Sequence, residues 1–80
     1  MKQYKILFTD IQQMRKFNAI VSEYPFRVNL YTDHYKIDAK SLMGIFSLDG
    51  TKPITLEAEA DDLGDFEEKI REYLAPEETV

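Results

Sequence analysis

The feature that most constrains the fold is the segment Ile54–Glu59 (ITLEAE), in which apolar and polar residues alternate strictly. Alternation with a period of two is typical of a β-strand with one buried face and one face in water. Strands of a parallel sheet are usually continuously apolar, because helices cover both faces. This segment therefore predicts an antiparallel sheet with one covered face. Its expected core residues are Ile54, Leu56 and Ala58, and Glu57 and Glu59 are expected to face water.

Three further segments have strand character. Residues 3–9 and residues 26–31 also alternate between apolar and polar side chains. A short polar turn at residues 32–34 then joins the second of these to residues 35–38. Two strands joined by so short a polar turn are typical of a β-hairpin, so we expect four strands in all.

The first helix is expected after Asp10. Gln13 follows Asp10 by three residues, which matches the N-cap and N3 positions of a capping box. Pro25 ends the helix, because proline cannot donate a backbone hydrogen bond and disfavours a helical residue before it. The apolar stripe of this helix consists of Ile11, Met14, Phe17, Ile20, Val21 and Tyr24.

The last helix is expected to begin at Asp61 or Asp62 and to end before Pro76. Acidic residues are favourable at a helix start because they complement the helix dipole. The predicted core face consists of Leu63, Phe66, Ile70, Tyr73 and Leu74. Residues 1–75 would then form one domain, and residues 76–80 would form a short C-terminal tail.

The run Asp38–Leu48 (DAKSLMGIFSL) is expected to hold a short helix that begins at Ser41. Serine is a preferred N-cap, and the same helix start would suit a phosphate group. A helix of two turns cannot bury all of the large side chains that follow. Some of these side chains are therefore expected to face outward, where they would form a possible docking surface.

The predicted order is β-α-β-β-α-β-α. This order indicates an α+β fold, an open-faced sandwich in which three helices cover one face of a four-stranded antiparallel sheet. The chain has 80 residues, which is the size of one small domain.

Composition excludes several classes of function. The chain contains no cysteine, so it has neither disulfides nor thiolate metal sites, and a cytoplasmic location is expected. The formal net charge of −5 argues against nucleic acid as the main partner. No apolar run approaches the roughly 20 residues that span a bilayer, so no membrane segment is expected. Acidic residues after position 60 match no calcium-loop spacing, and we expect neither a metal nor a cofactor.

The string Ala39–Gly44 (AKSLMG) at the start of the middle helix, together with the order of elements, resembles the HPr family of the bacterial sugar phosphotransferase system. The resemblance runs from about Tyr35 to Leu74. It implies that Ser41 corresponds to a serine that a regulatory kinase phosphorylates. It also implies that Leu42, Met43 and Phe46 form an exposed partner-binding face, with Ile45 and Leu48 on the buried side of the helix. The exposed face could equally be a homodimer surface. Lys40 is predicted to belong to the partner-binding residues, and it would be a favourable neighbour of a phosphate on Ser41.

The chain departs from the family at the catalytic segment, which reads Gly-x-His-x-Arg-Pro after the first strand. Here the same junction is Phe8–Arg15 (FTDIQQMR), without histidine, glycine or proline. Phosphocarrier activity of the usual kind is therefore expected to be absent. His34 is the one histidine of the chain and falls in the predicted turn, and Asp10 is explained by its capping role.

We therefore expect a non-catalytic, HPr-like docking or regulatory module rather than an enzyme, with Ser41 as its point of control. The resemblance implies protein partners: a serine kinase of the HPr type, a transcription regulator or phosphotransferase-system components. The alternative is a phosphocarrier that uses a non-standard acceptor, His34 or Asp10.

Overall fold

The computed structural model describes residues 2–33, 36–48 and 52–75. His34, in the predicted turn, and the predicted tail at residues 76–80 lie outside the described residues. The strands are β1 (Lys2–Ile6), β2 (Arg27–Tyr31), β3 (Lys36–Asp38) and β4 (Ile54–Glu59). The helices are α1 (Ile11–Ser22), α2 (Leu42–Phe46), α3 (Phe66–Lys69) and the 3-10 helix η1 (Arg71–Tyr73).

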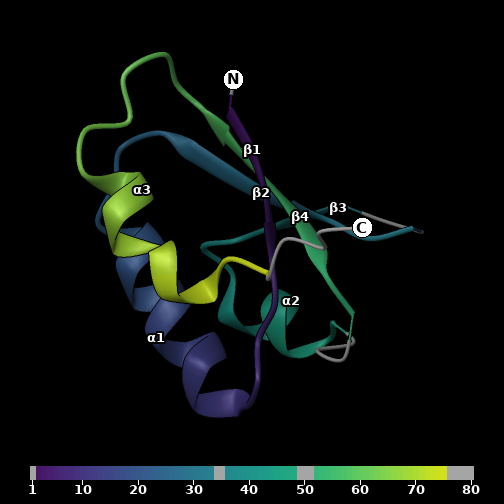
Figure 1. Cartoon of the computed structure of the whole chain (residues 1–80). Helices are drawn as coiled ribbons and strands as arrows, with labels where there is room; N and C mark the ends of the chain where they lie inside the picture. The colour runs from purple at the N-terminus through teal and green to yellow at the C-terminus, as the bar shows by residue number, and fades with distance from the viewer. Residues whose placement is uncertain (1, 34–35, 49–51, 76–80) are drawn as a thin grey trace, which may run out of the picture.

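The strands form one antiparallel sheet in the order β1-β4-β2-β3 (Figure 1). In the centre of the sheet, Leu56 of β4 lies opposite Tyr4 of β1 on one side and Leu30 of β2 on the other. The helices gather on one side of this sheet (Figure 1). The predicted α+β fold, an open-faced sandwich with a four-stranded antiparallel sheet and three helices, is therefore confirmed.

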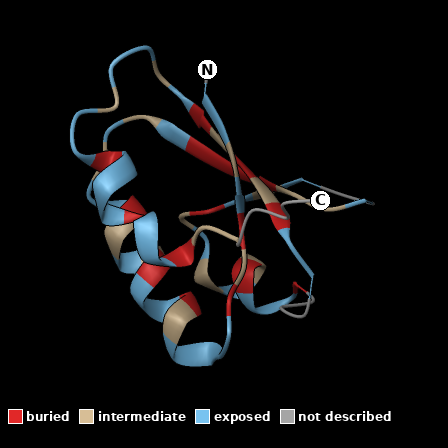
Figure 2. Cartoon of the chain, in the orientation of Figure 1, coloured by how far each residue is buried: buried red, intermediate tan, exposed pale blue. Residues whose placement is uncertain are grey.

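The core lies between the sheet and the helices, where the buried residues of both layers face each other (Figure 2). The alternation of β4 is confirmed, because Ile54, Leu56 and Ala58 are all buried. An aromatic cluster joins α1, η1 and the segment after β1: the ring of Phe17 on α1 lies 5.2 Å from that of Phe8 and 5.5 Å from that of Tyr73 on η1. Both contacts are edge-to-face, which is a favourable arrangement for aromatic rings.

The prediction for α1 needs two corrections. Ile11 was placed in the buried stripe, but its side chain is 62% exposed. It lies about 60–120° around the helix from the buried residues Met14, Phe17 and Val21, since each helical residue turns by about 100°. The capping box is also incomplete, because the side chain of Gln13 accepts from the backbone N–H of Thr9 instead of Asp10.

The last helix begins later than predicted and is shorter. The Asp62 carboxylate accepts a hydrogen bond from the Gly64 N–H at 3.0 Å, and Gly64 has a positive φ of 59°. This turn takes the place of the predicted first helical turn, and α3 starts only at Phe66. Beyond η1 the chain becomes extended, so that Leu74 pairs with Ile6 of β1. The predicted core residues Phe66, Ile70 and Tyr73 are nevertheless buried, and Leu63 and Leu74 pack partly against the core.

Candidate docking surface

Ser41 begins α2 as its N-cap, as predicted. Its backbone is extended, and its hydroxyl accepts a hydrogen bond from the Gly44 N–H at 3.2 Å. The turn before it is also bonded: the Asp38 carboxylate accepts from the Lys40 N–H, and the Asp38 carbonyl accepts from the Ser41 N–H, both at 2.9 Å. The turn therefore holds the Ser41 backbone, and the hydroxyl of this exposed residue is bonded to the first turn of α2.

The division of α2 into a buried and an exposed side agrees with the sequence prediction. Ile45 and Leu48 are buried, whereas Met43 is 78% exposed and Phe46 is 39% exposed. Leu42 is half-buried. Large apolar side chains with this exposure are unusual enough on a small domain to mark a candidate binding surface.

Two side-chain hydrogen bonds attach the start of α2 to α1. The Asn18 side-chain amide donates to the Ala39 carbonyl at 3.2 Å, and the Lys40 ammonium donates to the Tyr24 carbonyl at 2.6 Å. Lys40 was predicted among the partner-binding residues, and its contact with a partner stays a prediction. In the structure its ammonium is bonded to the segment that follows α1.

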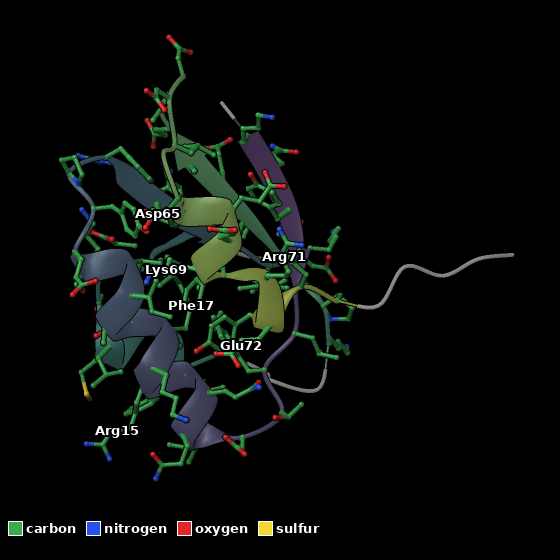
Figure 3. All side chains as sticks on the ribbon, turned by 60° about the vertical axis from the view of Figure 1, so that its left-hand side comes forward. Arg15, Phe17, Asp65, Lys69, Arg71 and Glu72 are labelled. Atoms are coloured by element: carbon green, nitrogen blue, oxygen red, sulfur yellow. The ribbon has the colours of Figure 1, made fainter. Side chains whose placement is uncertain are left out.

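Two exposed residues of α1, which the sequence prediction did not include in the surface, share a helix face with Asn18. Ile11 and Arg15 are spaced seven and three residues before Asn18, so all three share one face of the helix. Asn18 contacts the start of α2, which places this face beside α2. Arg15 is exposed and extends away from the body of the molecule (Figure 3). The helical spacing of residues 11, 15 and 18 in the sequence already indicated that they share one face of the helix.

The junction before α1 is the position where a phosphocarrier of the usual kind would hold its histidine. Asp10 occupies the N-cap, and its carboxylate accepts a hydrogen bond from the Gln13 N–H at 2.9 Å. The Gln13 side chain in turn accepts from the Thr9 N–H at 2.9 Å. The polar groups of this junction therefore satisfy one another, and the capping role predicted for Asp10 is confirmed.

The acidic residues near α3 hold this short helix in the fold. The Tyr24 hydroxyl donates to the Asp65 carboxylate at 2.6 Å, and the Tyr4 hydroxyl donates to the Glu67 carboxylate at 2.9 Å. Partial burial and these carboxylates raise the pKa of both tyrosines to about 12.

Within residues 2–33, 36–48 and 52–75, no group of three His, Cys, Asp or Glu side chains could hold a metal. No helix in this part of the chain is long and apolar enough to cross a membrane.

Comparison with known proteins places the fold among phosphocarriers. No protein-family model matches the sequence, and no curated protein matches it. The crystal structure of HPr-C-His from Thermoanaerobacter tengcongensis is 30% identical, with a TM-score of 0.67, and the match covers 89% of this chain and 84% of that chain. The phosphocarrier protein HPr from Bacillus anthracis is 26% identical, with a TM-score of 0.59, and the match covers 89% of this chain and 87% of that chain. The likeness therefore extends well beyond the segment that carried the resemblance in the sequence.

Proposed function

The chain belongs to the HPr family, and on this premise we propose that it is a non-catalytic member that acts by docking to other proteins. The observation that carries the proposal is the exposed apolar side of α2, formed by Leu42, Met43 and Phe46 directly after the Ser41 cap. Membership of the family suggests that the protein is related to the sugar phosphotransferase system. That it docks to other proteins without transferring phosphate is our proposal.

The charges around this surface indicate what a partner must offer. The chain has a net charge of −5, yet α1 and α2 contain no acidic residue, and α1 carries Arg15 and Lys16. A partner with an apolar pocket and carboxylates at its rim would complement this combination. We define the docking surface as Ile11, Arg15, Leu42, Met43 and Phe46.

Phosphorylation of Ser41 would regulate this surface. A phosphate adds a charge of about −1.5 to −2 next to Leu42 and Met43. Burying that charge against an apolar partner is costly, and an acidic rim on the partner would repel it. Because Ser41 is exposed and α2 is short, the modification would change docking without unfolding the domain.

The absence of phosphotransfer is supported by the sequence and by the role of Asp10. The junction before α1 has no histidine, and the Asp10 carboxylate is used to cap α1. The test is incubation with phosphoenolpyruvate and the general enzyme of the phosphotransferase system, followed by measurement of the intact mass. We expect no added mass. A phosphate located on Asp10 or His34 would support the alternative, a phosphocarrier with a non-standard acceptor, and would overturn our proposal.

The regulatory part is tested with a serine kinase of the HPr type and ATP. We expect one added phosphate on the native chain and none on Ser41→Ala. The variant Met43→Ser should lower kcat/KM of the kinase reaction, because the kinase must bind the same surface, whereas Glu68→Ser on α3 should leave it unchanged. If the native chain gains no phosphate, Ser41 acts only as a helix cap and the proposed regulation is wrong. A dimer that dissociates in Phe46→Ser would instead assign the surface to self-association.

A further inference from the structure

Both the backbone N–H and the side-chain ammonium of Lys40 donate hydrogen bonds within the fold. Its backbone N–H donates to the Asp38 carboxylate at 2.9 Å, and its ammonium donates to the Tyr24 carbonyl at 2.6 Å. The residue is half-buried. We propose that Lys40 is a positioning residue, which fixes α2 against α1 and thereby shapes the docking surface, without contacting the partner. The inference rests on the proposed docking function.

Tyr24, whose carbonyl accepts the bond from the Lys40 ammonium, is fixed by contacts of its own. The Tyr24 ring packs edge-to-face on Phe66 of α3, with ring centroids 5.1 Å apart, and tilted on Phe26 at 5.4 Å. The Tyr24 hydroxyl donates to Asp65, and its N–H donates to the Val21 carbonyl at the end of α1. The ammonium of Lys40 therefore connects the start of α2 to a point that is fixed to both α1 and α3.

The fold needs such a connection because α2 is only five residues long. Isolated helices shorter than about 12 residues are marginal in water, so tertiary contacts must hold α2 in place. Beneath the helix, Ile45 and Leu48 supply apolar contacts, which do not set an orientation by themselves. The Ala39 N–H donates to the Val28 carbonyl of β2 at 2.9 Å, which attaches the start of α2 to the sheet. The directional bonds towards α1 come from Lys40 and from Asn18, which donates to the Ala39 carbonyl at 3.2 Å.

These two bonds attach consecutive residues, Ala39 and Lys40, immediately before Ser41. The docking surface combines side chains of α1 with side chains of α2, so its shape depends on how the two helices are fixed to each other. A hydrogen bond from a charged donor is stronger than one between neutral groups. Lys40 should therefore contribute more than Asn18 to this attachment.

Hydrogen exchange of the free protein tests the proposal without any partner. Lys40→Met keeps the apolar stem and removes the ammonium, and Lys40→Arg keeps a cationic donor. In Lys40→Met we expect the Gly44 and Ile45 amides to exchange about tenfold faster or more, the size expected for loss of a hydrogen bond to a charged group. The core amides of the sheet should keep their rates, which shows that the domain stays folded. Lys40→Arg should restore most of the protection.

A second measurement separates positioning from contact with a partner. The serine kinase with ATP serves as the probe, at low and at high salt. If Lys40 acts by positioning, Lys40→Met lowers kcat/KM by a similar factor at both salt concentrations, because a bond within the fold is little screened. A loss that disappears at high salt would assign the Lys40 ammonium to contact with the kinase and would overturn the proposal. Unchanged exchange alone would also overturn it. Failure of the kinase to modify the native chain would concern the proposed regulation, whereas the exchange result would still decide the role of Lys40.

Discussion

Gly44 of α2 lies so close to Ile37 of β3 that a Cβ atom at position 44 would be 2.6 Å from Ile37 Cγ2. Real Cβ atoms do not approach another carbon so closely, and the Cγ2 methyl of a β-branched residue has little freedom to move. Glycine at position 44 therefore allows α2 to lie directly against the edge strand. The exposed face of α2 has its position in part because this residue has no side chain.

Gly44→Ala should lower the free energy of unfolding by about 1–3 kcal/mol, the usual cost of overpacking. The higher helix propensity of alanine would favour the opposite change by about 1 kcal/mol, so a net loss identifies the clash with Ile37 as the cause. Urea unfolding measures the difference. In an Ile37→Ala background, which removes the Cγ2 methyl, the same substitution should cost markedly less. An equal cost in both backgrounds would contradict the explanation.

Ser41→Ala should cost about 1 kcal/mol of stability, because the Gly44 N–H loses its side-chain acceptor at 3.2 Å. Ser41→Asp should remain close to the native stability, since aspartate is an equally good N-cap. Ser22→Ala is the matched control: its hydroxyl donates to the Asn18 carbonyl within the same helix, and its removal should have little effect. An equal loss for both alanine variants in thermal unfolding would count against the cap.

Tyr73→Phe should raise stability by about 1 kcal/mol. The Tyr73 side chain is 1% exposed, and its hydroxyl has no hydrogen-bond partner among the described residues. A buried hydroxyl without a partner costs about 1–3 kcal/mol, and phenylalanine keeps the contacts with Phe8 and Phe17. Tyr24→Phe is the opposite case, since its hydroxyl donates to Asp65, and this variant should be less stable. A destabilised Tyr73→Phe would show that its hydroxyl has a partner.

Stability should fall between pH 10 and pH 12. The pKa values of Tyr4 and Tyr24 are raised from 10.0 to about 12, by burial first and by the Glu67 and Asp65 carboxylates second. A pKa raised by folding contributes stability that is complete below the unfolded value and is lost as the pH passes the folded value. Urea unfolding at a series of pH values should show this decline, with tyrosinate absorbance rising over the same interval. A free energy that stays constant to pH 12 would contradict it.

Acid should weaken the open face of the sheet. The Tyr31 hydroxyl, which donates to Glu57 at 2.9 Å, is the main cause that lowers the pKa of this carboxyl from its ordinary value of 4.5. A lowered pKa contributes stability above the ordinary value and loses it as the pH falls through the folded value. In Tyr31→Phe the pKa of Glu57 should rise, measured by carboxyl NMR titration. Tyr4→Phe should leave it unchanged, because Tyr4 bonds to Glu67.

Features set by neighbours in the chain were predictable from the sequence. The alternation of β4 identified its buried residues, and Ser41 and Asp10 identified the starts of two helices. The division of α2 into Ile45 beneath and Met43 above was implied by the HPr resemblance, and helical spacing required only that some of the apolar side chains face outward. Each of these depends on residues a few positions apart, where backbone geometry decides which side chains share a face.

Features set by contacts between distant segments were not predictable. Asn29 lies between Val28 and Leu30 in the alternating segment of residues 26–31, yet it is 2% exposed, and its side-chain amide donates to the Glu57 and Glu59 carboxylates of β4. The delayed start of α3 depends on a turn that satisfies the Gly64 N–H with a side chain, which competes with helix formation.

Alternation, helix caps and charge thus determined the strands, the short helix at Ser41 and the apolar face after it. Only the tertiary structure decided that Asn18, on the α1 face that carries Ile11 and Arg15, bonds to the start of α2, and that the Lys40 ammonium is bonded to Tyr24. The physical reason is distance along the chain. A local pattern sets how a segment folds and which side is apolar, whereas the pairing of one segment with another depends on which donors, acceptors and surfaces the complete fold brings together.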